Sequence, residues 1–469
     1  MITVGNIVFA GIAPHPPIIV DQVGEGQNHD AQKTIAAMRQ WAKKLKAANP
    51  DLIIIITPHG NLFQDAVAIH GSPILKGDFS NFGVKGALYE FENHEEMQKQ
   101  IVLKAKEKGY SMVEVNDTNA GRYGLKKNLD HGVLVPLDFL SKEAVHVPLV
   151  VISMSLLDNL ELYKFGMLIE EVIANSKYNV ALIASGDLSH RLTRTAPAGY
   201  DPAGRDFDLI ILEKAKSGQL IEVMDIDEEL VERAGECGLR PIIMLAGALD
   251  RYKITSDIIS YEGPYGVGYL VASFNLEKSN QSSLEKWNVK RDDSLKKHRY
   301  NESPPVRLAR ESLAYFLETG KYLPVPEPVP EMLKEKKACF VSLKKHGHLR
   351  GCIGTIEPVR EMLTEEIIEN SVSAGIRDPR FLPVTLDELD DIVFSVDVLS
   401  KPEKISSKDE LDPMNYGIIV KSGGRSGVLL PNLEGVDTVE KQLDITLSKA
   451  GISPKENYTI FRFKVERYY

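Results

Sequence analysis

Residues that can bind a metal or carry a proton stand at the ends of four apolar segments of the 469-residue chain. His15 follows NIVFAGIAP, His59 follows LIIIITP, Asp187 and His190 follow ALIASG, and Glu262 ends DIISYE. Open α/β sheets carry their sites beyond the carboxyl ends of their strands. We therefore expect these residues, distant in sequence, to meet at one edge of a sheet.

Two histidines and one carboxylate on separate strands form the ligand set of a mononuclear non-haem Fe(II) site with open coordination positions. His15 and His59 share a context, because each ends an apolar run and lies beside a proline. Functional residues concentrate at such loop positions. The pattern favours these two histidines as ligands, while a structural hydrogen-bonding role is the alternative for each.

Two further histidines have acidic neighbours in the sequence. His190 is suited to accept a proton from a substrate hydroxyl, with Asp187 orienting the imidazole or tuning its pKa. In the alternative interpretation, Asp187 caps the following turn and His190 lies on the surface. His131, next to Asp130, either supports the metal ligands or is a loop histidine that pairs with its neighbour.

The elements that must position these residues alternate along the first 276 residues. Helical spacing predicts helices over 31–48, 95–108, 159–175, 206–216 and 240–251, between the apolar runs. This alternation predicts an α/β domain whose sheet is covered on both faces, without indicating strand order. Residues 277–304 are polar and charged, which favours a linker over a surface helix. Residues 305–469 combine two strand groups with helices and predict an α+β domain.

Composition narrows the function classes. The net charge of −10 argues against non-specific nucleic-acid binding. Three cysteines without a CxxC pair indicate reduced thiols in a cytoplasmic protein. The sequence shows no signal-peptide pattern and no apolar run near the roughly 20 residues that span a bilayer, so we expect no membrane segment.

Five motifs of the first domain resemble a known family. GIAPHPP, TPHG, LDHGVLVPL, SGDLSHRL and SYEGPYGVGY together are similar to class III extradiol (LigB-like) ring-cleaving dioxygenases and to the related MEMO family. The resemblance implies Fe(II) held by His15, His59 and a third ligand best matched by Glu262, with Glu236 as the fallback. It also implies His190 as the catalytic acid/base and a small-molecule substrate, of aromatic type, that reacts with O₂.

One departure bears on the third ligand. MEMO proteins carry a cysteine near that position, and no cysteine lies between Cys237 and Cys339. This gap favours the carboxylate set over a thiolate set. Ring cleavage does not follow from the ligands alone, because one fold and metal set can host several reactions.

The second domain resembles the AMMECR-type family through HLRGCIG, AGIRDPRF and GRSGVLLPNLEGVDT. These motifs gather glycines with potential anion-binding and nucleophilic groups: Arg350, Cys352, Arg377, Asp378, Arg380 and Arg425. Arginine suits planar anions, and an arginine beside Cys352 would lower the pKa of its thiol. In the alternative interpretation, the arginines and Asp378 pair with one another and Cys352 is buried.

The fusion resembles the AmmeMemoRadiSam group, in which both domain types accompany a radical SAM protein, and so implies such a partner. This chain has no CxxxCxxC motif for that partner's iron–sulfur cluster. Three hypotheses follow: an Fe(II)-dependent oxidoreductase of the extradiol type, a non-catalytic metal-binding scaffold for a radical SAM partner, and catalysis through Cys352 in the second domain alone.

Overall fold

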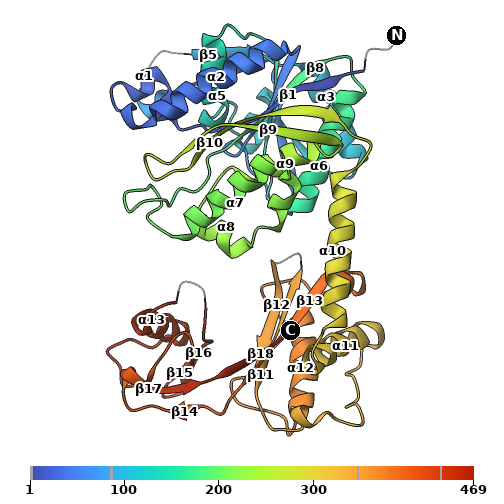
Figure 1. Cartoon of the computed structure of the whole chain (residues 1–469), viewed down its shortest axis with the longest axis vertical. Helices are drawn as coiled ribbons and strands as arrows, with labels where there is room; N and C mark the ends of the chain where they lie inside the picture. The colour runs from blue at the N-terminus through green and yellow to red at the C-terminus, as the bar shows by residue number, and fades with distance from the viewer. Residues whose placement is uncertain (1–3, 85–87, 346–347, 434–435) are drawn as a thin grey trace. The chain divides into compact units, whose positions relative to one another are not determined.

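The computed structural model describes residues 4–84, 88–345, 348–433 and 436–469, and the chain forms two compact units, 1–289 and 290–469 (Figure 1). The division falls inside the segment expected to be a linker. That segment is the end of a strand followed by helix α10 (Ser283–Tyr300), so it is a helix and not an irregular connection. Trp287 explains why the helix begins on the first unit: its side chain is 8% exposed and its indole nitrogen donates to Asp225.

An eight-stranded sheet organises the first unit, in the order β6-β3-β7-β2-β8-β1-β10-β9. Its strands are β1 (Asn6–Ala13), β2 (Leu52–Thr57), β3 (Ala66–His70), β6 (Ser111–Val115), β7 (Leu149–Ser153), β8 (Asn179–Ser185), β9 (Tyr252–Glu262) and β10 (Tyr269–Lys278). The central trio β2, β8 and β1 runs parallel, whereas β10 is antiparallel to both of its neighbours. The carboxyl ends of β1, β2 and β8 therefore lie at one edge of the sheet.

Helices cover both faces of this sheet (Figure 1). The long ones are α2 (Gln32–Ala48), α3 (Glu95–Glu107), α5 (His131–Lys142), α6 (Asn159–Ala174), α7 (Ala203–Ser217) and α9 (Leu239–Ala248), and the short ones are α1 (Asp21–Gly24), α4 (Asp117–Tyr123) and α8 (Glu228–Ala234). The five helices predicted from spacing all occur, with ends shifted by a few residues. A small hairpin, β4 (Ile74–Asp78) and β5 (Leu88–Glu92), completes the unit.

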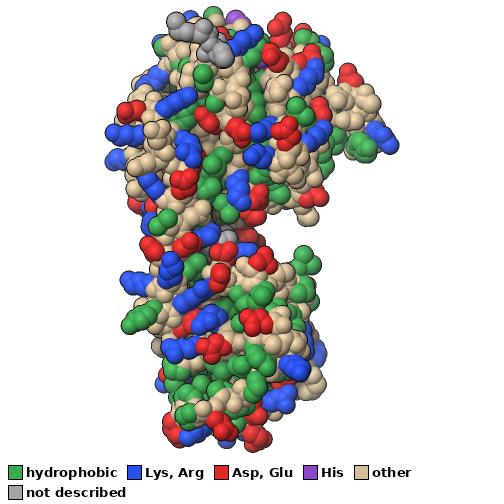
Figure 2. Space-filling model, turned by 90° about the vertical axis from the view of Figure 1, so that its right-hand side faces the viewer, with side chains coloured by type: hydrophobic (Ala, Val, Ile, Leu, Met, Phe, Trp, Pro, Cys, Tyr) green, Lys and Arg blue, Asp and Glu red, His purple; other side chains and the backbone are tan. Residues whose placement is uncertain are grey.

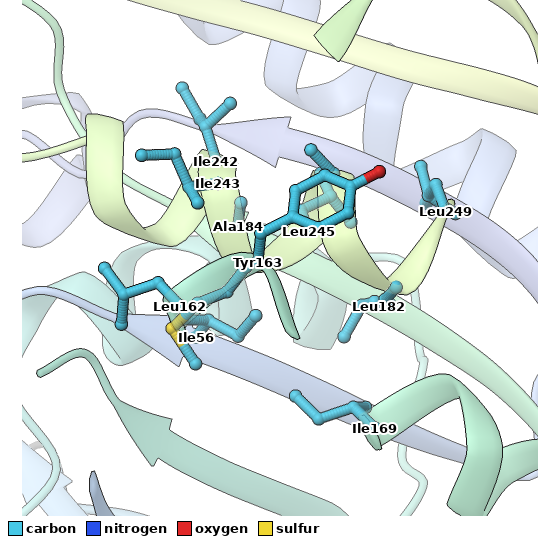
Figure 3. Packing of buried hydrophobic residues seen from close by; sticks show 14 of the residues in the cluster. Ile56, Leu162, Tyr163, Ile169, Leu182, Ala184, Ile242, Ile243, Leu245 and Leu249 are labelled. Atoms are coloured by element: carbon cyan, nitrogen blue, oxygen red, sulfur yellow. The ribbon is translucent and has the colours of Figure 1, made fainter. Parts of the chain in front are cut away.

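Strand β2 shows why a run of five consecutive aliphatic residues is stable here. Alternate side chains point to opposite faces of a strand. Ile54 and Ile56 enter the core formed with α6 and α9, whereas Ile53 and Ile55 enter the core formed with α2 and α5. Figure 3 shows part of the first core, in which Ile56 lies near Leu162 and which also contains Leu182, Tyr163 and Ile242. A strand buried on both faces must be apolar throughout, so the predicted α/β class is confirmed.

The second unit contains two four-stranded sheets. The first has the order β12-β11-β13-β18 and the second β14-β17-β15-β16. Their strands are β11 (Cys339–Lys345), β12 (His348–Gly354), β13 (Ile392–Leu399), β14 (Glu403–Lys404), β15 (Gly417–Ser422), β16 (Arg425–Leu429), β17 (Thr459–Phe463) and β18 (Val465–Tyr468). Helices α11 (Pro304–Thr319) and α12 (Leu363–Ile376) pack on the first sheet, and α13 (Val439–Ala450) packs on the second. The predicted α+β class is confirmed.

The surface mixes charges of both signs. Figure 2 shows lysine, arginine, aspartate and glutamate side chains interspersed over the face in view. Among the helices built from described residues, none combines the length and the apolarity that crossing a membrane requires.

Candidate metal centre

Three potential metal ligands converge in the first unit. The ligand atoms of His15, His59 and Cys237 all lie within 4.8 Å of one another, and no other group of three or more such residues is this compact in the described part of the chain. The Nε2 atoms of His15 and His59 are 2.9 Å apart. The Sγ atom of Cys237 is 3.5 Å from the Nε2 atom of His15.

The sheet order explains how the two histidines meet. His15 follows β1 and His59 follows β2, and β8 lies between these two strands. Both loops bend over the end of β8, where the Oγ atom of Ser185 lies 2.9 Å from the Nδ1 atom of His15. The backbone N–H of His15 donates to the Asp187 carboxylate at 2.8 Å, which fixes the loop in this position.

Cys237 reaches the site because two glycines let their loops touch. A Cβ atom on Gly186 would lie 2.2 Å from the Cα atom of Gly238, a distance that no side chain tolerates. The close approach is secured by Cys237 itself, whose N–H donates to the carbonyl of Asp187 at 3.3 Å. The N–H of Asp187 in turn donates to the Cys237 sulfur at 3.3 Å.

Hydrogen bonding determines which ring nitrogen of His15 carries a proton and which one presents a lone pair to the site. Ser185 donates its hydroxyl hydrogen to the carbonyl of Gly132 at 2.5 Å, so its oxygen is left to accept from the Nδ1 atom of His15. Nδ1 of His15 therefore carries the proton, and Nε2 presents its lone pair toward His59 and Cys237. Ligating histidines are oriented in this way by a partner on the other ring nitrogen.

The donor geometry fits a transition metal. Two imidazole nitrogens that each lie about 2.0–2.1 Å from one metal are about 2.9 Å apart when the bond angle is near 90°. The observed separation of the two Nε2 atoms is 2.9 Å. Burial lowers the pKa of both His15 and His59, so both are neutral, as ligands must be. Burial also raises the pKa of the Cys237 thiol, so a metal must displace its proton on binding.

Two more histidines border these ligands. The ring of His131 stacks on that of His59 with centroids 4.3 Å apart, and Nε2 of His190 lies 3.9 Å from Sγ of Cys237. Burial lowers the pKa of His190 and lowers that of His131 to about 4. In the described part of the chain, the Asp187 carboxylate makes no hydrogen bond or ion pair with the His190 ring. It holds the backbone of His15, and burial raises its pKa to about 7.

Glu262, expected as the third ligand, lies elsewhere. Its carboxylate accepts hydrogen bonds from the backbone N–H of Thr34 at 2.7 Å and from the Thr34 hydroxyl at 2.5 Å, at the start of α2. The reason is the sheet order: β10 separates β9 from β1, which places Glu262 two strand spacings, or about 10 Å, from the His15 strand.

The fallback, Glu236, is also engaged elsewhere. Its carboxylate accepts from the backbone N–H of Leu239 at 2.6 Å and so caps α9, and burial raises its pKa to about 7. Among the described residues, the third potential ligand that lies beside His15 and His59 is Cys237 and neither carboxylate. A thiolate is available despite the absence of cysteines between Cys237 and Cys339, because Cys237 itself lies one residue beyond Glu236.

Three of the four arginines expected at a site in the second unit form ion pairs with acidic side chains. Arg350 binds the Glu388 carboxylate at 2.9 Å, and Arg380 binds that of Asp378 at 2.7 Å and holds its pKa well below the usual range. Arg425 pairs with Glu456 on the other sheet. Arg377 ends α12, where its N–H donates to the carbonyl of Ser373.

Cys352 does not have the lowered pKa that a neighbouring arginine would give it. Arg350 points at Glu388, Leu382 and Pro383, and burial raises the pKa of the Cys352 thiol. The Ser342 hydroxyl donates to its sulfur at 3.2 Å. The ion pairs of Arg350, Arg380 and Arg425 agree with the interpretation in which the arginines pair with acids, and Cys352 is half-buried.

Comparisons with known proteins agree with the two-unit organisation. Residues 10–272 match the family model described as the catalytic LigB subunit of aromatic ring-opening dioxygenase, and residues 306–468 match the AMMECR1 model. A Clostridium acetobutylicum protein is 43% identical over 460 residues, which cover 97% of this chain and 98% of the relative. A Thermotoga maritima protein is 49% identical over 170 residues, or 36% of this chain and 98% of the relative.

Among solved structures, an uncharacterized Pyrococcus horikoshii protein is 36% identical with a TM-score of 0.33, covering 35% of this chain and 88% of that one. Because the two family models match separate units and one relative spans both, the chain belongs to the family of proteins that join a LigB-type dioxygenase domain to an AMMECR1 domain.

Proposed function

We propose that the first domain is a metal-dependent oxidoreductase of the oxygenase type, with His15, His59 and Cys237 as the metal ligands. The observation that carries the proposal is the convergence of three ligand atoms within 4.8 Å at the carboxyl edge of the sheet. A redox-active metal held there would supply activation of O₂ and of a hydroxylated substrate. Iron is the metal that the family resemblance implies, while a thiolate ligand also suits copper and zinc.

The proton chemistry is assigned to the histidines that border the ligands. His190 is neutral at pH 7 because burial lowers its pKa, so its ring can accept a proton from a substrate hydroxyl. Its Nε2 atom lies 3.9 Å from the Cys237 sulfur, within reach of a molecule bound beside the metal ligands. We assign His190 as the general base and His131 as a positioning residue that supports the His59 ring.

The surroundings of His131 support a flat substrate. The ring of Phe82, which is 39% exposed, meets His131 edge-on with centroids 5.3 Å apart. Because His131 stacks on the candidate ligand His59, an exposed aromatic ring beside His131 offers a surface near the site on which a planar molecule can stack. This is why we propose a small aromatic compound with adjacent hydroxyl groups as the substrate class.

Anaerobic reconstitution of the full chain tests the proposal. Fe(II), Cu(I) and Zn(II) are each titrated into metal-free protein, bound metal is quantified, and catechol is added before O₂ consumption is followed. Stoichiometric Fe(II) with catechol binding and O₂ uptake supports the oxidoreductase. The His15→Ala variant is the control, because it removes a ligand on a loop outside the hydrophobic cores.

The same experiment separates the remaining alternative. A metal-binding scaffold for a radical SAM partner would bind metal stoichiometrically yet show neither catechol binding nor O₂ uptake. Catalysis through a Cys352 thiolate is not proposed, because burial raises the pKa of that thiol.

A further inference from the structure

A pocket of about 540 Å³ lies where the two sheets of the AMMECR1 domain meet. Its floor is built from four buried or half-buried apolar residues, which are Ala338 just before β11, Leu399 at the end of β13, Ile419 in β15 and Phe461 in β17. Loops on either side supply Ile356, Pro358 and Pro402. The volume falls in the range of about 300–1,000 Å³ that is typical of small-molecule sites.

Four lysines surround this apolar floor: Lys336, Lys337, Lys401 and Lys421. A single acid, Glu357, lines the pocket with them. Three of the lysines form ion pairs that are at least partly exposed to solvent, with Glu361, Glu335 and Glu357 respectively. Lys401 forms no ion pair with any residue that the structure describes. Exposed ion pairs are weak, so these ammonium groups remain available to a ligand.

The pocket also offers an aromatic face. The Nζ atom of Lys421 lies 5.5 Å from the centroid of the Phe461 ring. A ring next to a cation can stack with a flat apolar body while the cation binds an attached anionic group. Lysine is a compact point charge, which suits a phosphate group at least as well as a carboxylate.

We infer that this pocket is a binding site for a small organic anion with a flat apolar body. The anionic group contacts Lys401 and Lys421, and the ring lies on Phe461 and Ile356. This site is independent of the metal ligands of the first domain. Glu357 competes with the ligand for Lys421, because its carboxylate oxygen lies 2.6 Å from the Lys421 ammonium group and repels an incoming anion.

Isothermal titration of the full chain tests the inference with two probes, AMP as a nucleoside phosphate and 2-naphthoate as an aromatic carboxylate. Inorganic phosphate and adenosine serve as the separate halves of AMP. We expect saturable binding of at least one intact probe, and much weaker binding of each half. Tighter binding of AMP would identify a phosphate ligand, and tighter binding of naphthoate a carboxylate ligand.

Four variants locate the binding. Lys401→Gln and Lys421→Gln should each weaken it by about tenfold, the usual effect of losing a hydrogen bond to a charged group. Phe461→Leu, which keeps the apolar contact, should weaken it severalfold. Glu357→Gln should strengthen it, since it frees Lys421. Lys449→Gln, on α13 and outside the pocket, is the matched control and should leave affinity unchanged.

Two results would overturn the inference. One is the absence of saturable binding of both intact probes up to about 10 mM. The other is binding that is equally strong in the Lys401, Lys421 and Phe461 variants, since the ligand would then occupy a different place. Weaker binding in Glu357→Gln would contradict the competitor role assigned to that carboxylate.

Discussion

Replacing Cys237 by serine decides between the thiolate and the carboxylate as third metal ligand. The variant keeps nearly the same volume, so the domain should stay folded, but serine is a poor metal ligand at neutral pH. Substitution of an outer-shell partner already costs about 10–100-fold in metal affinity, and loss of a direct ligand should exceed this range. We therefore expect metal affinity to fall by at least about 100-fold in Cys237→Ser.

Glu262→Gln is the opposite perturbation, and its effect can be worked out from the structure. One carboxylate oxygen accepts two hydrogen bonds from Thr34 at the N-terminus of α2. Glutamine keeps an acceptor oxygen but loses the negative charge, which is worth about 0.3–1 kcal/mol at a helix N-terminus. The melting temperature should fall by roughly 1–4 °C. Metal affinity should not change.

The assay is competition with a chromophoric chelator under anaerobic conditions, with thermal unfolding of the metal-free proteins measured in parallel. Cys237→Ser should change affinity with little change in melting temperature, and Glu262→Gln should do the reverse. The reasoning fails if Glu262→Gln loses the metal while Cys237→Ser retains it. In that case, the protein would rearrange to the carboxylate set when metal binds.

Four further outcomes are expected. His190→Gln should retain stoichiometric metal but lose about 10²–10⁴-fold in turnover, because glutamine cannot take up the proton; loss of metal in this variant would make His190 a ligand. Metal binding at pH 7 should release about one proton, from Cys237, because the lowered pKa values of His15 and His59 leave these rings already neutral. Calorimetry in buffers of different ionisation enthalpy measures the number of protons released. A release of no protons or of two protons would contradict this expectation. Burial lowers the pKa of His70 to about 4 in the folded protein, so on acidification the unfolded chain binds a proton at this residue before the folded protein does. The free energy of unfolding should therefore fall as the pH drops from about 6.5 toward 4. Urea unfolding should show a smaller fall over this pH range in His70→Asn. A fragment of residues 1–276 should unfold at lower urea than one of residues 1–300, because it lacks Trp287, whose removal from a core costs about 3–5 kcal/mol; equal midpoints would show that this contact contributes nothing.

The sequence alone determined the fold class and two of the three side chains in the candidate metal centre. Apolar runs that alternate with helical patterns require a sheet covered on both faces, and the structure has one. His15 and His59 were predictable because each ends an apolar strand, and parallel strands bring their carboxyl ends to one edge. The proline at position 58 and those flanking His15 reinforced this, since they mark where each strand must stop.

Tertiary structure decided which third side chain lies beside the two histidines. Glu262 satisfied the same rule as the histidines, because it ends a strand at the same edge. Strand order, which periodicity does not encode, places β10 between β9 and β1 and puts the carboxylate out of reach. Cys237 could not be predicted from the position of a strand end, because it lies in a loop between α8 and α9.

The only feature of the sequence that pointed to a role for Cys237 was the neighbouring glycine, Gly238. Gly238 allows its loop to touch Gly186, and the contact carries Cys237 to His15. A glycine in the sequence indicates that a close backbone contact is sterically possible, but it does not identify the segment that makes the contact. The partner is fixed by packing between segments about 50 residues apart, and only the folded chain brings those segments together.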